Sequence, residues 1–324
     1  MLNRIFGLET EYGLLVHEDP ATHSPTWFAH KIRDYLFHKQ KQGVLDMHHR
    51  AYDEPPGNGG FLRNAGRIYL DMGHIEYASP ECGSLTDLVA VDRAGDRLIQ
   101  DAIEAMGFGD TVSLIKNNID HETDATFGSH ENYLVTRNFP FTYKGLGKLV
   151  PFLVTRQLFT GSGRIGASDT GDGLILLDPR NGQPMRPSRA PEIPFQISQR
   201  ADHIVNDFFE WVQGNRAIVN TRDEPLADPE QFRRIHLLLG DSNMAEVATA
   251  LKLGTTGLVL QLIEEGHAPT GFDFDDAVET LKEVSRDQDR TWLVQLTSGK
   301  TLSAIDIQEE FLAAASKHYR GQDE

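Results

Sequence analysis

The first part of the chain alternates apolar and polar residues in the way that is typical of β-strands. Near the start, Leu8, Thr10 and Tyr12 fall on one face of an extended segment, while Glu9 and Glu11 fall on the other. Similar alternation recurs in three later segments, and in one of them a turn separates two strand-like halves. We therefore predict strands over these ranges: 4–14, 67–77 (strand, turn, strand), 112–118 and 131–137.

Helix-start signals and apolar spacing of three and four residues become more frequent later. Ser24-Pro25 is a good N-cap and first-turn pair. Ser84, with Asp87 three residues on, resembles a capping box, and the helix that follows is expected to stop at Gly107. The predicted helices cover approximately these ranges: 25–40, 84–106, 196–213, 229–237, 243–265, 273–285 and 303–319.

Strands early in the chain and helices late indicate an α+β fold whose sheet is antiparallel or mixed rather than doubly wound. The segment 166–194 is rich in Gly, Pro and Asp, which predicts a hairpin insertion. With 324 residues, the chain exceeds the usual size of one domain. We expect one large domain over residues 1–324 that carries this insertion.

The charge balance excludes some partners. A net charge of −17 argues against nucleic acid, because a phosphate backbone requires a basic surface. A single cysteine, Cys82, suits a reducing compartment. No stretch approaches about 18 uninterrupted apolar residues, so no membrane span is predicted, and the expected location is the cytoplasm.

Three strand-like segments each place two polar side chains at positions i and i+2, on one face. Such side chains are roughly 6–7 Å apart, which suits separate oxygen ligands of neighbouring divalent ions. Mg²⁺ prefers a few carboxylates together with phosphate oxygens and water, so a sheet face of this kind indicates a Mg–nucleotide site. The alternative is a solvated sheet face without function. The pairs are Glu9/Glu11, His74/Glu76 and His130/Asn132.

Asp71 and a set of arginines complete the candidate chemistry. A carboxylate beside bound cations stays ionised near neutral pH, as a base or nucleophile must, although an aspartate in this position, taken alone, is more often an ordinary turn residue. Guanidinium groups suit phosphate oxygens, and the alternative for each is a surface ion pair. Gly161-Ser162-Gly163 is no Walker motif because the Gly-Lys-Ser/Thr end is missing. The arginines in question are Arg156, Arg164, Arg200 and Arg222.

Taken together, these segments resemble the family of Pup ligases and depupylases, which attach or remove the prokaryotic ubiquitin-like protein. The resemblance covers nearly the whole chain, and its His-Glu-Asn-Tyr-Leu and Thr-Arg-Asp-Glu-Pro strings are specific. The matching segments are Gly7 to Gly13, Tyr69-Leu70-Asp71 with His74-x-Glu76-Tyr77, Lys116-Asn117-Asn118, Gly128 to Leu134, Pro151 to Gln157, Ser198-Gln199-Arg200, Asn220 to Pro225 and Gly240 to Met244.

The resemblance implies a fold similar to glutamine synthetase, in which a curved antiparallel (mixed) sheet packed by helices forms a cradle for ATP and Mg²⁺. Asp71 would be the catalytic carboxylate. The residues implied as metal ligands are Glu9, Glu11, Glu76 and His130, and those implied as nucleotide contacts are Asn132, Arg164, Arg200 and Arg222.

In a ligase of this family, ATP phosphorylates the C-terminal glutamate of the modifier, and a lysine of a target protein attacks the acyl phosphate. In a depupylase, the same residues hydrolyse the isopeptide or a C-terminal glutamine amide. The sequence favours the ligase narrowly, with a Pup-like modifier and lysine-bearing proteins as partners. A small-molecule ligase of the glutamine synthetase type and a non-catalytic nucleotide-binding module are also compatible with these residues.

Two departures from the family pattern stand out. Ile75 occupies a position that is usually proline, which is expected to alter the turn after Asp71. The chain also ends soon after the helix predicted near 303–319, whereas family members continue into a smaller C-terminal domain. That domain is therefore expected to be absent or truncated.

Overall fold

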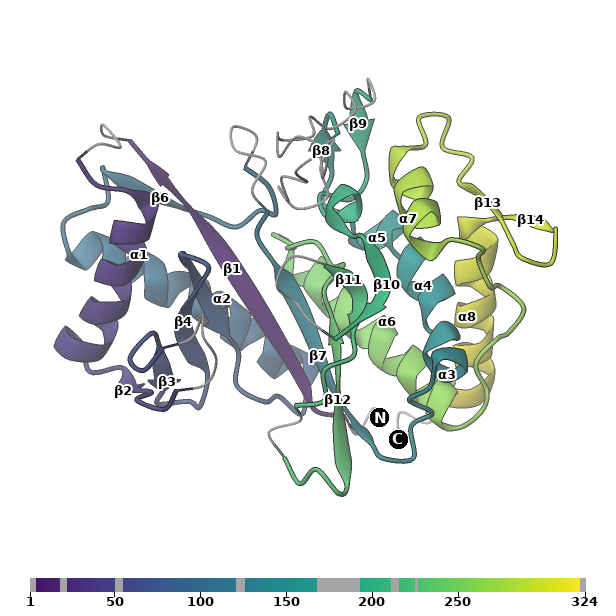
Figure 1. Cartoon of the computed structure of the whole chain (residues 1–324), viewed down its shortest axis with the longest axis horizontal. Coiled ribbons are helices and arrows are strands. Elements are labelled where there is room, and N and C mark those ends of the chain that lie inside the picture. The colour runs from purple at the N-terminus through teal and green to yellow at the C-terminus, as the bar shows by residue number, and fades with distance from the viewer. Residues whose placement is uncertain are drawn as a thin grey trace, which may run out of the picture. The chain divides into compact units, whose positions relative to one another are not determined.

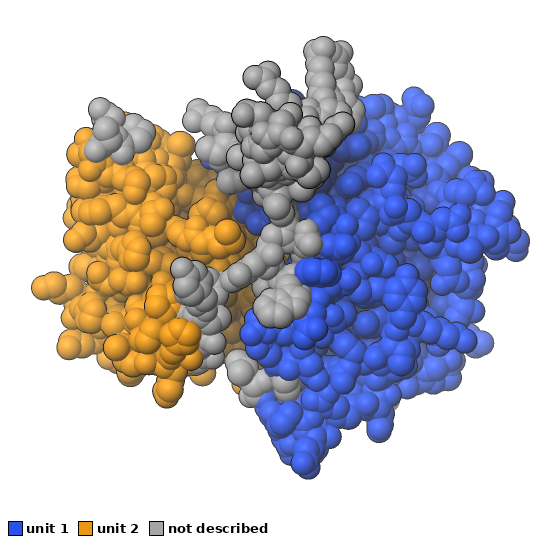
Figure 2. Space-filling model, in the orientation of Figure 1, with its two compact units in different colours: residues 1–4, 119–126, 133–324 blue, residues 5–118, 127–132 orange. Residues whose placement is uncertain are grey.

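The computed structural model describes residues 4–17, 22–49, 55–120, 126–167, 193–210, 216–224 and 227–320. The chain divides into two compact units (Figure 2). Unit 2 comprises residues 5–118 and 127–132, and unit 1 comprises residues 1–4, 119–126 and 133–324. Most of the hairpin insertion predicted over residues 166–194 lies outside the described residues.

Unit 2 is built on an antiparallel sheet with strand order β2-β3-β4-β5-β1, and β6 also pairs with β1. The strands are β1 (Phe6–Val16), β2 (Gly43–Leu45), β3 (Gly60–Leu62), β4 (Arg67–Asp71), β5 (His74–Ala78), β6 (Val112–Ile115) and the first half of β7 (Ser129–Thr136). The helices are α1 (Pro25–Asp34), its π-helical continuation η1 (Tyr35–Lys39) and α2 (Leu85–Ala105).

Both helix starts predicted in this part of the chain are confirmed. The side chain of Ser24 accepts a hydrogen bond from the backbone N–H of Trp27, and that of Ser84 accepts one from the backbone N–H of Asp87. Each serine thus satisfies a donor that the first helical turn leaves unpaired. Helix α2 ends at the predicted place, and Gly107 follows with a positive φ of 81°.

The core of unit 2 lies between the sheet and the two helices, which pack against β1 and its neighbours (Figure 1). Alternation along β1 points Leu8, Thr10 and Tyr12 toward the helices, so Glu9 and Glu11 face the opposite side of the sheet. The strand prediction for residues 4–14 is therefore confirmed. The largest fully buried side chains of this core are Tyr12, Phe28, Ile32, Leu36, Ile68, Ile75 and Tyr77.

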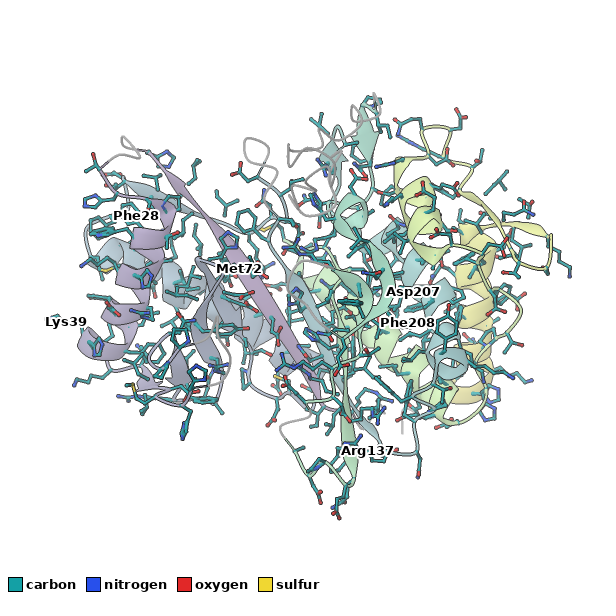
Figure 3. All side chains as sticks on the ribbon, in the orientation of Figure 1. Phe28, Lys39, Met72, Arg137, Asp207 and Phe208 are labelled. Carbon is teal, nitrogen blue, oxygen red and sulfur yellow. The ribbon has the colours of Figure 1, made fainter. Side chains whose placement is uncertain are left out.

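A two-residue turn joins β4 to β5. Asp71 pairs with His74, and the residues between them, Met72 and Gly73, have φ values of 46° and 92°. Positive φ at both central positions is the geometry that suits a tight hairpin. Met72 is exposed at the tip of this turn (Figure 3). Ile75 lies beyond the turn as a buried strand residue, so the hairpin closes regularly with isoleucine at this position.

A buried charge network fixes β1 to α2 and to the end of β6. Lys116 Nζ donates to Asp92 Oδ2 at 2.8 Å and to Asp96 Oδ1 at 3.0 Å. From β1, Tyr12 donates its hydroxyl to Asp96 Oδ1 at 2.7 Å, and Thr10 donates to Asp92 Oδ1 at 3.3 Å. The strand that carries Glu9 and Glu11 is thus held from its helix-facing side.

Unit 1 combines a mixed sheet with most of the helices. Strand β10 pairs in parallel with β11, and β11 pairs antiparallel with β12. The strands are β8 (Arg164–Ile165), β9 (Phe195–Gln196), β10 (Asn206–Phe209), β11 (Ala217–Asn220), β12 (Phe232–Leu237), β13 (Leu293–Gln295) and β14 (Thr301–Ser303), with the second half of β7. The helices are α3 (Tyr143–Gly147), α4 (Val150–Thr155), α5 (Gln157–Thr160), η2 (Ala201–His203), α6 (Glu246–Glu264), α7 (Ala277–Arg286) and α8 (Ala304–Tyr319). The α+β class with an antiparallel and partly mixed sheet is confirmed.

Two of the predicted helices are wrong. Residues 229–237 contain strand β12, and residues 196–213 contain a short 3₁₀ turn followed by strand β10. The helices predicted near 243–265, 273–285 and 303–319 are present as α6, α7 and α8.

Among the described residues, one helix is long and apolar enough to cross a membrane. It is α6, and 56% of its apolar window is buried inside the protein. Such burial is typical of a helix in a protein core.

Candidate active site

Strand register in unit 2 gathers the predicted site residues on the face of the sheet that points away from α1 and α2. Glu11 on β1 lies opposite Glu76 on β5, and Glu76 lies opposite Tyr69 on β4. Asp71 and His74 form the next pair of the β4–β5 ladder that lies on this same face, two positions along. Side chains opposite each other, or two residues apart, share a face, so the register itself places these groups together.

Glu11, Asp71 and Glu76 form the centre of this face, which we name the carboxylate cluster. One oxygen from each lies within 4.8 Å of the others. Burial raises the pKa of Glu76 well above its usual value, and the negative charges of Glu11, Glu9 and Asp71 raise it further. Such a cluster is stable in its ionised form only when a cation compensates the charge.

Glu76 also has an unsatisfied oxygen. Its side chain is buried, with 1% of the residue exposed. The Tyr69 hydroxyl hydrogen-bonds the carboxylate, but Oε1 has no hydrogen-bond partner among the described residues. A buried oxygen without a donor is unfavourable unless a ligand such as a metal ion completes it.

Histidine and amide groups border the carboxylate cluster. His130 Nδ1 lies 3.3 Å from Glu9 Oε2, and Asn132 Nδ2 donates to Glu9 Oε1 at 3.2 Å. On the other side, His74 Nδ1 lies 3.5 Å from Glu11 Oε2. All three pairs predicted at i and i+2 therefore meet on one face of unit 2.

Gly128 brings the chain close to this face just before β7. Its carbonyl oxygen accepts a hydrogen bond from the backbone N–H of Glu11 at 3.1 Å. A Cβ at Gly128 would lie 2.4 Å from His130 Nε2 and 2.5 Å from Glu11 Oε1. Only glycine therefore fits without moving two of the predicted ligands.

Replacement of Gly128 by alanine is expected to weaken divalent-metal binding by about 10–100-fold, the range seen when groups that orient metal ligands are disturbed. The nearby atoms are ends of side chains that can rotate away, so the melting temperature should change little. Titration with Mn²⁺ measures the affinity. The control is Gly83→Ala, since no described heavy atom lies within 4 Å of a Cβ at Gly83. Unchanged Mn²⁺ affinity in Gly128→Ala would place the metal elsewhere.

The predicted arginines lie in unit 1 and bind different partners. Arg200 is fully buried and donates to Thr126 Oγ1 at 2.8 Å and to the Leu238 carbonyl oxygen at 3.0 Å. Arg164 is buried with Asp202, at 3.5 Å between Nη1 and Oδ2. Arg222 is the most accessible, with 45% of its side chain exposed and an ion pair to Glu224.

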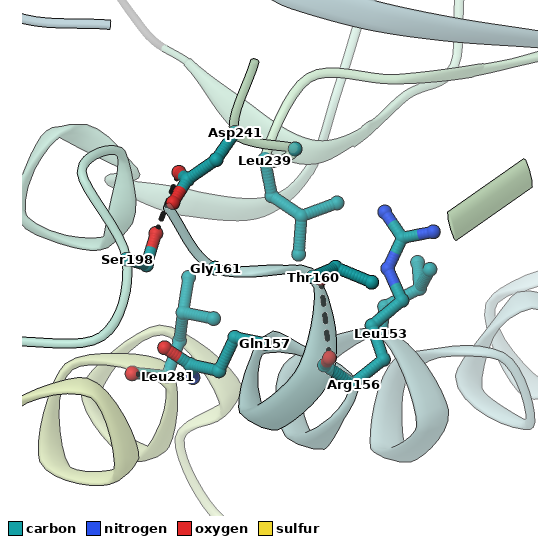
Figure 4. A pocket seen from close by; sticks show the side chains of 10 residues that line it. Leu153, Arg156, Gln157, Thr160, Gly161, Ser198, Leu239, Asp241 and Leu281 are labelled. Atoms are coloured by element: carbon teal, nitrogen blue, oxygen red, sulfur yellow. Dashed lines mark hydrogen bonds between the residues drawn. The ribbon is translucent and has the colours of Figure 1, made fainter. Parts of the chain in front are cut away.

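Asp241 organises the segment that contains Arg200. Its carboxylate accepts hydrogen bonds from the backbone N–H groups of Ser162, Gln199 and Arg200 and from the Ser198 hydroxyl. A cavity of about 10 Å³ lies beside it (Figure 4), which is room for about one water molecule. The two motifs Gly161-Ser162-Gly163 and Ser198-Gln199-Arg200 are thus held together by one buried aspartate.

A second polar group lies on the sheet of unit 1, and sequence reasoning missed part of it. Asn220 on β11 pairs with His236 on β12, and Asn220 Nδ2 lies 3.2 Å from His236 Nδ1. Arg234 is two residues before His236, on the same face, and its Nη2 lies 3.8 Å from Glu224 Oε2. The alternation of Arg234 and His236 with the buried Ile235 and Leu237 is the signal that would have revealed them.

Comparison with known proteins gives the family. The sequence profile of the Pup-ligase protein family matches residues 4–324. The Pup–protein ligase of Saccharomonospora viridis is 38% identical over 332 aligned positions, which cover 100% of this chain and 65% of that protein. A depupylase of Acidothermus cellulolyticus is 36% identical, over 98% of this chain and 64% of that protein.

Solved structures agree with the sequence comparison. The Pup ligase PafA in complex with Pup is 36% identical, with a TM-score of 0.74, over 98% of this chain and 57% of that one. PafA in complex with ADP is 38% identical, with a TM-score of 0.68, over 82% of this chain and 55% of that one. The chain belongs to the Pup-ligase family. It spans just under two thirds of the length of the curated relatives that it matches.

Proposed function

We propose that this protein is an ATP- and Mg²⁺-dependent ligase that joins the C-terminal carboxylate of a Pup-like modifier to a lysine of a target protein. The observation that supports it best is the carboxylate cluster of Glu11, Asp71 and Glu76, in which two buried carboxylates and the half-buried Asp71 bring oxygen atoms close together. Relatives that are Pup ligases, with PafA solved both with ADP and with Pup, support the nucleotide and the modifier as substrates.

The residues present fit a magnesium ion. Hard divalent cations take carboxylate oxygens, and the buried Oε1 of Glu76, which has no hydrogen-bond partner among the described residues, is available as such a ligand. We propose Glu9, Glu11, Glu76 and His130 as the residues that hold Mg²⁺ together with the nucleotide. When bound, the cation would neutralise charge on the phosphate oxygens during phosphoryl transfer.

The reaction would proceed in two steps. The modifier's carboxylate oxygen attacks the γ-phosphorus of ATP, which forms an acyl phosphate and releases ADP. The lysine amine then attacks the acyl carbon, the isopeptide bond forms and inorganic phosphate leaves. The amine must lose a proton in this second step, and we propose the Asp71 carboxylate as its acceptor.

The proposed nucleotide contacts differ in their surroundings. Asn132 lies on the carboxylate-cluster face of unit 2, which favours this role. Arg222 has an exposed guanidinium group, whereas those of Arg164 and Arg200 are enclosed by protein partners. All four remain predictions, as does the cytoplasmic location.

Isopeptide formation and isopeptide hydrolysis are separated by one experiment. The protein is incubated with ATP, Mg²⁺, a Glu-ended modifier and a lysine-bearing protein, and the products are followed by mass spectrometry and ADP quantitation. A ligase forms ADP in proportion to isopeptide. A depupylase, which the Acidothermus relative represents, forms no isopeptide in this mixture and cleaves a preformed conjugate, added in a parallel incubation, without net nucleotide turnover. ADP formation with free glutamate and an amine instead would indicate a small-molecule ligase.

A further inference from the structure

Unit 1 contains a groove that the proposed chemistry does not use. Its volume is about 560 Å³, and it is lined by α3, the start of α4, strand β10, and the segment that leads into α7. This volume lies within the usual range of ligand-binding clefts. We name it the α3–β10–α7 groove.

The groove is predominantly acidic. Five acidic residues line it and only one basic residue, Lys282, does so. Helix capping explains Asp276, whose side chain accepts from the backbone N–H of Glu279 at the start of α7. Helix capping does not explain Asp207, which lies on strand β10. The acidic residues are Asp207, Asp273, Asp275, Asp276 and Glu279.

An aromatic wall adjoins one of these carboxylates. The rings of Tyr143 and Phe208 pack edge to face with centroids 5.2 Å apart, and the Tyr143 hydroxyl donates to Asp207 Oδ2 at 3.2 Å. Tyr143 is 74% exposed, although it is a large side chain that would bury much apolar area. Asp207 and Phe208 lie next to each other on β10 (Figure 3).

Aromatic faces beside carboxylates complement one kind of side chain. Lysine and arginine place their apolar stems on aromatic rings and their cationic ends near carboxylates. Glu279 is paired with Lys282 at 3.8 Å between Oε2 and Nζ. An acidic partner would be repelled by this groove, and an uncharged apolar one would leave its other carboxylates without a cationic partner.

We propose that the α3–β10–α7 groove docks a basic, apolar-containing segment of the lysine-bearing target protein. The docked segment is distinct from the reacting lysine, because the groove residues take no part in the proposed chemistry. This assignment rests on the proposed ligase function for the identity of the partner.

The test uses the full chain and the double variant Asp207→Asn/Asp275→Asn, which spares the capping residue Asp276. The control is Glu309→Gln/Glu310→Gln, an equal charge change at exposed positions of α8. Fluorescence anisotropy follows a labelled peptide of lysine and leucine residues. Removal of two surface charges is expected to weaken its binding about tenfold in the groove variant and to leave the control unchanged.

Conjugation kinetics give the second readout. The groove variant should raise KM for a protein target with a lysine-rich segment about tenfold at unchanged kcat, while free lysine as acceptor reacts as in wild type. Equal peptide affinity in wild type and groove variant, or an equal loss in the control, overturns the proposal. Because peptide binding needs neither ATP nor modifier, a failure of the ligase function would appear separately, as absence of conjugation in wild type.

Discussion

Asp71→Asn is expected to lower the rate of isopeptide formation by about 10²–10⁴-fold, the usual contribution of a positioned general base. Asparagine keeps the shape of aspartate but cannot accept the proton of the attacking amine. The variant should fold as well as wild type, because the substitution removes one of three crowded negative charges in the carboxylate cluster. Single-turnover conjugation with preformed acyl phosphate measures the step directly.

The position of Asp71 also allows a different role, since its carboxylate reaches the same region as those of Glu11 and Glu76. A metal ligand and a base are distinguished by Mn²⁺ affinity. If Asp71 acts as a base, the Mn²⁺ affinity of Asp71→Asn should change less than tenfold. If Asp71 is a metal ligand, Mn²⁺ affinity and activity should fall together. The matched control is Asp101→Asn, at an exposed position of α2. Normal conjugation by Asp71→Asn would remove this residue from the mechanism.

Local rules were sufficient for much of unit 2. Side chains alternate between the two faces of a strand, so Glu9 and Glu11 share a face whichever strand pairs with theirs. Ser24 and Ser84 start their helices through hydrogen bonds to backbone groups three residues on. The pairing of Glu11 with Glu76 depends on strand register between segments more than sixty residues apart, which no local pattern encodes. The resemblance to a family, and not periodicity, indicated that these carboxylates belong together.

The two wrong helices have different physical causes. In residues 229–237, arginine and leucine are good helix formers, but strand pairing with β11 overrides that preference. In residues 196–213, the backbone N–H groups of Gln199 and Arg200 donate to the distant Asp241, which excludes a continuous helix there. In both cases a tertiary partner decided the local structure.

Arg200 shows why the site was only partly predictable. Its residue type favours a phosphate contact, but its guanidinium group donates to Thr126 and Leu238 in a fully buried position. A sequence gives the type of side chain, while the contacts that enclose it depend on packing. His236 was missed for a different reason. Its segment was predicted to be a helix, so its place on the face of strand β12, opposite Asn220, could not be recognised.

The Lys116 network leads to the largest expected effect on stability. Only 7% of the Lys116 side chain and 3% of the Asp92 side chain are exposed, so Lys116→Met leaves a buried carboxylate without its cation. Breaking a buried ion pair on one side costs about 3–5 kcal/mol. We therefore expect the free energy of unfolding, measured by urea denaturation, to fall by about that amount. The control is Lys39→Met, at an exposed position of η1 (Figure 3).

Removal of the remaining charges distinguishes loss of the ion pair from loss of packing. In Lys116→Met/Asp92→Asn/Asp96→Asn no uncompensated carboxylate is left, so a large part of the stability should return. Because Thr10 and Tyr12 donate to these aspartates from β1, the single variant should also loosen the strand that carries Glu9 and Glu11. Its Mn²⁺ affinity should then fall at temperatures where the protein is still folded. A single variant as stable as Lys39→Met would show that water, and not Lys116, compensates Asp92.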